Sequence, residues 1–299
     1  MINTPKSLPL RGLRLLLGSA LVSASFASLE ASTVLINENF STLTTSTGLT
    51  QAGWYFRNGD STGAAWPAPA SLASPIGNLS GTVLRGGLTS GTSANTWLLK
   101  QWGGTTLTDV GDSLTLSFDA VFSGSDEFNV SFFDAEQTIT GNALGGASPI
   151  AGASGYGYMQ TFGANPVAGV ISSTVQTGTQ TGANSDVNTL RDSLGSIPSI
   201  TGSAYNFSLT ATKVEDGAQI SFYRDGTLLS SWVDTSIVGG MELNTFKIRL
   251  TGTTTSRYID NIVLTQGSAI PEPSTYAAFA GVAVLGLAAG RRRRASDVQ

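Results

Sequence analysis

The chain of 299 residues contains no cysteine and no histidine. Without cysteine the fold has no disulfide framework, and no thiolate is available for catalysis or for a metal site. Without histidine the chain lacks both the usual general base near neutral pH and the most common ligand of transition metals. Hydrolysis by a serine–histidine–aspartate triad is therefore excluded.

Charged side chains are also scarce, at 12% of the residues, and their signs are unevenly distributed. Between Ser28 and Ile270 there are 18 Asp and Glu residues against 9 Lys and Arg residues, a net charge of −9. The whole chain has a net charge of only −4 because seven of its 16 basic residues lie near the two ends. A middle segment this acidic is a poor partner for nucleic acid, whose binding depends on neutralised phosphates. It is compatible with neutral glycans or with a matrix that contains Ca²⁺.

A long uncharged run lies close to the C-terminus, from Ser274 to Gly290. A turn made of Pro271, Glu272 and Pro273 precedes it. Four arginines follow it: Arg291, Arg292, Arg293 and Arg294. An apolar run closed by cations predicts a short transmembrane helix whose guanidinium groups stay on the cytoplasmic side. The two prolines predict a stiff, extended break just outside the membrane, where a processing enzyme can bind.

This order of residues resembles the PEP-CTERM sorting signal. The resemblance covers residues 270–295, about a tenth of the chain, and implies export by a Gram-negative-type bacterium that makes exopolysaccharide. It also implies that exosortase, a membrane-embedded enzyme, cuts near the proline turn, so that insertion in the inner membrane is transient. An ordinary permanent anchor is the alternative, but a span of about 17–20 residues rich in Ala and Gly is short for a stable one.

The N-terminus carries a second targeting pattern. Three basic residues come first: Lys6, Arg11 and Arg14. An apolar stretch from Leu15 to Val22 and several small residues follow. This pattern predicts a secretory signal peptide over residues 1–27, which the Sec export machinery would recognise. Residues 25–27 and 29–31 both offer a cleavage site.

The middle of the chain predicts an all-β fold. Glycine, serine and threonine dominate it, few segments show helical periodicity, and short alternating runs recur. The ten runs expected to be strands are 33–37, 82–85, 96–102, 113–122, 128–133, 205–212, 218–223, 227–233, 245–250 and 258–264. The pair Asp225-Gly226 lies between two of them and favours a tight hairpin turn. We therefore expect residues 32–268 to form one two-sheet sandwich of the jelly-roll type.

Residues 135–201 are the least strand-like part of this domain. Their runs of Gly, Ala, Ser and Thr bury little, so we interpret the region as a loop-rich insertion, with a separate second domain as the alternative. Within it, 156–162 and 167–171 are candidate strands. Residues 186–194 are a candidate helix with Ser185 as its cap.

The first and last expected strands carry a second resemblance. Residues 34–40 and 258–264 resemble the first and last strands of carbohydrate-binding jelly rolls and of laminin-G or concanavalin-like sandwiches. That resemblance implies that the two strands pair and that a structural Ca²⁺ lies near their ends, with Glu38 and Asp260 as its carboxylates. The alternative is that Asp260-Asn261 marks a β-bulge or a sheet edge, because the spacing of a full Ca²⁺ loop is missing.

A glycosidase needs two carboxylates, and Asp134 and Glu136 are the nearest candidate pair. They would share one face of a strand, but they lie at its end in a polar turn. The third acid of the common laminarinase-type pattern is missing as well. We therefore interpret them as solvated loop residues and predict that the protein is not an enzyme.

Large aromatic side chains are the remaining route to a function, because they stack on sugar rings where they are exposed. Trp66, which lies between prolines in an Ala-rich loop, is the first candidate for glycan binding. Trp54, in the run Trp54-Tyr55-Phe56, is the second. Trp97 and Trp102 are separated by an odd number of residues, so one of them is expected in the core.

Together these patterns predict a non-catalytic exported protein of the cell surface or extracellular matrix. We expect it to associate with exopolysaccharide or biofilm and to bind glycan. A secreted β-sandwich glycoside hydrolase and a purely structural matrix protein are the alternatives.

Overall fold

The computed structural model describes residues 31–43, 46–58, 68–85, 94–121, 127–135, 138–141, 143–144, 154–161, 168–173, 190–194, 203–235, 239–252 and 258–268. The two predicted targeting segments lie outside these ranges, as do Trp66 and Glu136. The residues of the predicted sorting signal also lie outside: Pro271, Glu272, Pro273, Arg291, Arg292, Arg293 and Arg294. No helix within the described ranges is long and apolar enough to span a membrane.

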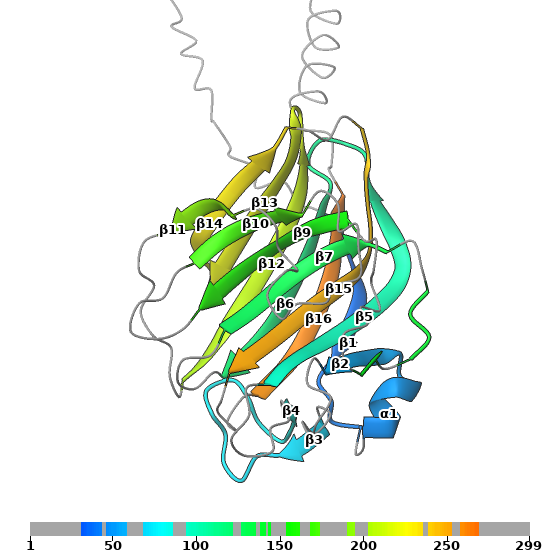
Figure 1. Ribbon diagram of the computed structural model, residues 1–299, viewed down its shortest axis with the longest axis vertical. Coiled ribbons are helices and arrows are strands. Elements are labelled where there is room, and N and C mark those ends of the chain that lie inside the picture. Colours follow the sequence, from blue (N-terminus) through cyan, green and yellow to red (C-terminus); the bar gives the residue numbers. More distant parts are fainter. Residues whose placement is uncertain are drawn as a thin grey trace, which may run out of the picture. The chain divides into compact units, whose positions relative to one another are not determined.

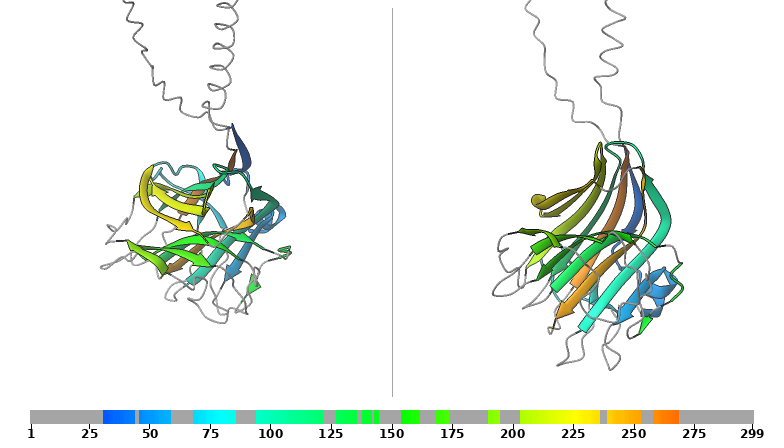
Figure 2. Two further views of the ribbon diagram at one scale, coloured as in Figure 1. Left: turned by 90° about the horizontal axis from the view of Figure 1, so that it is seen from above. Right: turned by 45° about the horizontal axis from the view of Figure 1, so that its top comes forward.

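The strands within the described ranges form two sheets of eight strands each, which we call sheet A and sheet B (Figures 1 and 2). Sheet A has the order β14 (Thr227–Asp234), β13 (Gly217–Arg224), β12 (Ala204–Val214), β6 (Ser113–Val121), β16 (Tyr258–Ser268), β4 (Thr82–Arg85) and β3 (Ala68–Ser71), and β1 (Ala31–Glu38) also pairs with β16. Sheet B has the order β11 (Leu190–Leu194), β10 (Ala168–Ser173), β9 (Ser154–Thr161), β7 (Glu127–Asp134), β15 (Met241–Gly252), β5 (Ala94–Leu107), β2 (Trp54–Asn58) and β8 (Ala143–Leu144). Among these described strands, every pairing is antiparallel except the short one between β2 and β8. The predicted all-β, two-sheet sandwich is confirmed.

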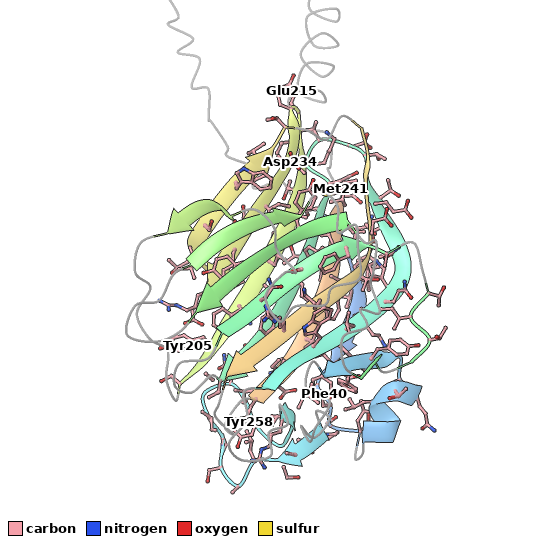
Figure 3. The ribbon with its side chains drawn as sticks, viewed as in Figure 1. Phe40, Tyr205, Glu215, Asp234, Met241 and Tyr258 are labelled. Atoms are coloured by element: carbon pink, nitrogen blue, oxygen red, sulfur yellow. The ribbon has the colours of Figure 1, made fainter. Side chains whose placement is uncertain are left out.

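The core lies between the two sheets and follows from the alternation of side chains along each strand. In β6, Leu114, Leu116 and Phe118 are fully buried, whereas Thr115 and Ser117 between them are only half-buried. The buried residues meet apolar side chains of sheet B in one continuous cluster. Phe40 and Met241, labelled in Figure 3, belong to this cluster. Burial of one face per strand is what a period of two predicts for a sandwich.

Two local predictions about turns and pairing are also confirmed. Asp225 and Gly226 have φ values of 49° and 72° and join β13 to β14, as expected for a hairpin turn. The first and last strands, β1 and β16, pair in an antiparallel register. Near the start of β16 the register with β6 shifts between Asp260 and Val263, and Asn261 has a φ of 51°. The β-bulge that we considered as an alternative for Asp260-Asn261 is therefore present.

The described residues of the 135–201 region, which we expected to be a loop-rich insertion, include paired strands. They supply β9, β10 and β11, which extend sheet B beyond β7. Residues 190–194 are a strand paired with β10, so the candidate helix over 186–194 is wrong for this part. The helical pattern there is short. Pairing with β10 satisfies the backbone N–H and C=O groups that a helix would otherwise satisfy. A six-residue helix that the sequence did not predict, α1, spans Ser46–Gln51.

Candidate functional site

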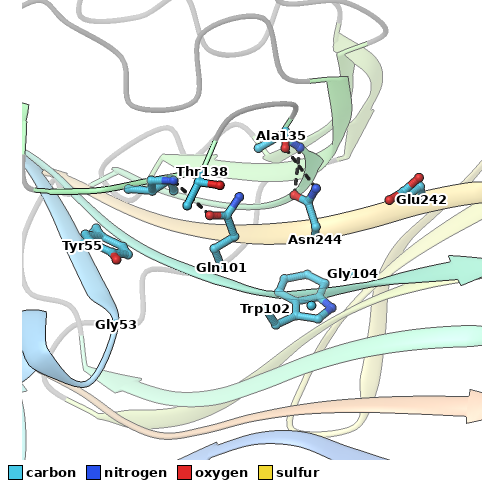
Figure 4. A pocket seen from close by; sticks show the side chains of 11 residues that line it. Gly53, Tyr55, Gln101, Trp102, Gly104, Ala135, Thr138, Glu242 and Asn244 are labelled. Carbon is cyan, nitrogen blue, oxygen red and sulfur yellow. Dashed lines mark hydrogen bonds between the residues drawn. The ribbon is translucent and has the colours of Figure 1, made fainter.

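A pocket opens beside sheet B, where β2, β5 and β15 meet the chain that leaves β7 (Figure 4). Its volume is about 430 Å³, which is typical of sites for small ligands. The described residues that line it are Gly53, Tyr55, Gln101, Trp102, Gly103, Gly104, Ala135, Thr138, Ile139, Glu242 and Asn244.

Tyr55 forms the aromatic wall of the pocket. Its neighbours Trp54 and Phe56 are fully buried in the core between the sheets. The period of two along β2 therefore turns Tyr55 to the outer face of sheet B. There it lies half-buried against a small apolar cluster made of Trp97, Leu99, Phe133, Ala135 and Ile139.

The floor of the pocket comes from an irregularity between β5 and β15. The register shifts between Leu243 and Thr245, so that Asn244 alone opposes three residues of β5: Trp102, Gly103 and Gly104. Gly104 has a φ of 87°, which side chains rarely allow, and a Cβ added to Gly103 would meet nothing within 4 Å. The two glycines therefore expose bare backbone, which lets a ligand approach closely.

Asn244 holds the chain that follows β7 against the pocket. Its Oδ1 accepts hydrogen bonds from the Ala135 backbone N–H and from the Thr245 hydroxyl, both at 2.9 Å. Its Nδ2 donates to the Ala135 carbonyl at 3.0 Å and to Asp134 Oδ1 at 3.2 Å. Asp134, one half of the candidate acid pair, is therefore an acceptor that helps to position Asn244.

Gln101 fixes the next part of the same chain segment. Its Oε1 accepts a hydrogen bond from the Ile139 backbone N–H at 3.0 Å (Figure 4). The two amides thus position Ala135 and Ile139 as a second wall of the pocket. A wall held by side chain–backbone hydrogen bonds keeps its shape before a ligand arrives, which lowers the entropy cost of binding.

Glu242 is the only residue with a formal charge among the described residues that line the pocket. It is exposed on β15, near the bulge. Its carboxylate only accepts hydrogen bonds, so it suits a ligand that carries hydroxyl groups. The pocket therefore combines an aromatic ring, a bare backbone floor and an exposed hydrogen-bond acceptor.

Trp54 does not lie where a sugar could reach it, so the expectation that it binds glycan is corrected. Its side chain is 0% exposed, and its ring packs at centroid distances of 5.6 Å from Phe40 and 5.7 Å from Phe246. Its indole N–H donates to Glu38 Oε2 at 3.3 Å. The size of the ring and the partner for its N–H favour the core over a surface platform.

The two predicted Ca²⁺ ligands have different surroundings. Glu38 uses both oxygens within the chain, since Oε1 accepts from the Phe40 backbone N–H at 2.7 Å and Oε2 accepts from Trp54. Asp260 lies directly across from Asp119 in the register of β16 and β6. Within the described ranges, no group of three acidic side chains is arranged to hold a metal ion. The calcium site stays a prediction.

Asp260 is a buried carboxyl group with one unsatisfied oxygen. It is 3% exposed, and its Oδ1 has no hydrogen-bond partner. The opposite residue, Asp119, accepts from Asn206 Nδ2 at 2.9 Å and from Asn261 Nδ2 at 2.8 Å. Burial raises the pKa of Asp260 to about 6; the negative charges of Asp119 and Glu38 add to the rise, and the Asn261 backbone N–H opposes it.

No protein-family model matches this chain, and no curated protein matches its sequence. Several solved structures are similar in fold. The peanut lectin in complex with a nine-residue peptide has 11% identity, a TM-score of 0.47, and coverage of 81% of this chain and 99% of its own. The globular domain of T. cruzi calreticulin has 11% identity, a TM-score of 0.46, and coverage of 78% and 88%. The potassium-bound carbohydrate recognition domain of Emp46p has 10% identity, a TM-score of 0.46, and coverage of 80% and 97%. At these values a function has to be argued from the site itself.

Proposed function

We propose that this chain is a non-catalytic, exported protein that binds glycan in the pocket between Tyr55 and Glu242. The observation that carries the proposal is the combination of groups in the pocket. Sugar rings have an apolar C–H face and a rim of hydroxyl groups. In an oligosaccharide that spans the pocket, the aromatic wall contacts the C–H face of one ring, and the carboxylate accepts hydrogen bonds from hydroxyl groups of another. Gly103 and Gly104 line the pocket on β5 and carry no side chain that would fill it.

The same pocket is poorly suited to hydrolysis of a glycosidic bond. That reaction needs two carboxyl groups on either side of the bond, about 5–9.5 Å apart. Glu242 is the only carboxylate among the described lining residues, and Asp134 accepts a hydrogen bond from Asn244. We therefore expect an assay for reducing-sugar release to give no signal above background with any polysaccharide that the protein binds.

Replacement of Tyr55 by alanine is expected to weaken glycan binding by about tenfold, because the sugar loses its aromatic contact. The ligand would be chosen from a glycan array probed with the purified chain, and the affinity measured by isothermal titration calorimetry. Tyr223→Ala is the matched control, since Tyr223 is also half-buried but lies on β13 of sheet A. Thermal unfolding of both variants shows whether they are folded.

Two results would contradict this account. If Tyr55→Ala binds as tightly as the wild-type chain, the pocket is not the binding site. If the wild-type chain binds no glycan on the array, the purely structural matrix protein becomes the better interpretation.

The proposal of export rests on the two ends of the sequence. A secretory signal peptide at residues 1–27 and a PEP-CTERM-like segment at 270–295 support secretion through Sec, transient insertion in the inner membrane and processing by exosortase. The protein would then act on the cell surface or in an exopolysaccharide matrix. The polysaccharides of that matrix offer the ligand that the pocket requires.

Mass spectrometry of the protein from its native host tests this part. We expect a new N-terminus after Ala27 or Ala31 and a C-terminus near the turn of Pro271, Glu272 and Pro273. Recovery of the chain from the cytosol with both ends intact would contradict export. Loss of the N-terminal segment alone would favour a permanent anchor over exosortase processing.

A further inference from the structure

The donors and acceptors of the pocket are unevenly distributed. Both N–H groups of Asn244 donate to the protein itself, to the Ala135 carbonyl at 3.0 Å and to Asp134 Oδ1 at 3.2 Å. The indole N–H of Trp102 also donates inside the protein, to Thr105 Oγ1 at 3.2 Å. The exposed carboxylate of Glu242, in contrast, can only accept. The N–H donors of Asn244 and Trp102 are thus already used, while the charged acceptor Glu242 is exposed at the pocket.

Two described cations near the pocket are held within the protein. The ammonium group of Lys247 is buried 4.6 Å from the centroid of the Trp97 ring, in the apolar cluster that Tyr55 contacts. The ammonium group of Lys100 lies behind Gly53, where it would be 3.2 Å from an added Cβ. It donates to the Ala52 carbonyl and lies 5.1 Å from the centroid of the Trp54 ring, on the core side of β2. Burial lowers the pKa of Lys100, and the negative charge of Glu38 opposes this effect. Lys100 is therefore a core cation and not a group that faces a ligand.

We infer that the pocket binds uncharged glycans and discriminates against polysaccharides that carry carboxylate or sulfate groups. The inference rests on the proposed function, because it names the class of glycan that the same pocket accepts. A hydroxyl group of a neutral sugar donates a hydrogen bond to Glu242. A uronate or sulfate at that position places a like charge against Glu242 and cannot use the donors of Asn244 or Trp102. The net charge of −9 between Ser28 and Ile270 has the same sign and adds to the repulsion.

The test compares neutral and acidic probes on the same protein. The neutral probes are laminarin, dextran and galactomannan, and the acidic probes are alginate, hyaluronan and heparin. At low ionic strength we expect at least one neutral probe to bind, and every acidic probe to bind about tenfold more weakly or not at all. The Glu242→Lys variant is expected to reduce this preference by about fivefold, because it replaces the repelling charge by an attracting one.

Glu215→Lys is the matched control, because it changes the net charge by the same amount away from the pocket. Glu215 is exposed between β12 and β13 of sheet A (Figure 3). If Glu215→Lys changes the preference as much as Glu242→Lys, the discrimination comes from overall charge and the assignment to the pocket is wrong. If alginate, hyaluronan or heparin binds as tightly as the neutral probes and Tyr55→Ala abolishes that binding, the inference is overturned while the proposed function stands. If neither these probes nor a glycan array gives binding, both are overturned.

Discussion

The Gly155→Ala variant is expected to lose about 3 kcal/mol of its free energy of unfolding. Gly155 lies on β9, opposite Phe133 of β7. A Cβ added there would lie 1.9 Å from the Phe132 carbonyl oxygen and 2.8 Å from Phe133 Cα. Both are backbone atoms, so no side chain can rotate out of the way. The methyl group can be accommodated only if β9 moves away from β7, which breaks hydrogen bonds of sheet B.

Gly141→Ala is the control for this prediction. A Cβ on Gly141 would meet no atom within 4 Å, so we expect its free energy of unfolding to stay within about 0.5 kcal/mol of the wild-type value. Urea denaturation followed by circular dichroism measures both variants. If Gly155→Ala is as stable as Gly141→Ala, β9 does not lie against β7 in the register described above.

The Asp260→Asn variant is expected to be more stable than the wild-type chain at neutral pH and equally stable in mild acid. The pKa of Asp260 is about 6 in the folded protein and 3.8 in the reference state. The folded state therefore binds the proton more tightly, and wild-type stability falls as the pH rises from about 4 through 6. The asparagine side chain has nearly the same shape as that of aspartate but carries no charge. At pH 7.5 we expect the substitution to add about 2 kcal/mol to the free energy of unfolding, and at pH 4 to add almost nothing.

Thermal unfolding of both proteins from pH 4 to pH 8 measures this difference. A constant difference across that range would contradict a buried, titrating Asp260.

The predicted Ca²⁺ site would give the Asp260→Asn variant a change in stability of the opposite sign. If Asp260 bound Ca²⁺, Asp260→Asn would destabilise the protein in the presence of the ion, and a chelator would lower wild-type stability. The Asp216→Asn variant is a suitable control, because Asp216 is exposed in the turn between β12 and β13.

The strands could be predicted because their patterns are local. The alternation of Leu114, Leu116 and Phe118 with hydroxyl side chains identifies β6 without knowledge of its neighbours. The strands of the 135–201 region were harder to recognise, because Gly155 and Gly157 occupy the positions that pack closely on β7. A glycine that is required by the neighbouring strand looks, in sequence, like a glycine in a loop.

The pocket could be predicted only in part. The run Trp54-Tyr55-Phe56 indicated aromatic side chains, but only the pairing of β2 with β5 shows that Tyr55 faces outward while Trp54 faces the core. The pair Gly103-Gly104 inside a strand pattern is a local signal for a bulge, but it does not show which residues lie opposite. The contributions of Asn244 and Glu242 depend on the register of β15 with β5, which joins residues far apart in the chain and leaves no local signature.

The most direct test of the central claim is a crystal structure of the protein with the glycan that it binds most tightly. The account predicts an oligosaccharide along the pocket, with one sugar ring against Tyr55, the chain above the backbone of Gly103 and Gly104, and a hydroxyl group of a further ring within hydrogen-bond distance of the Glu242 carboxylate. Electron density for the glycan on any other surface, with this pocket filled only by solvent, would contradict it.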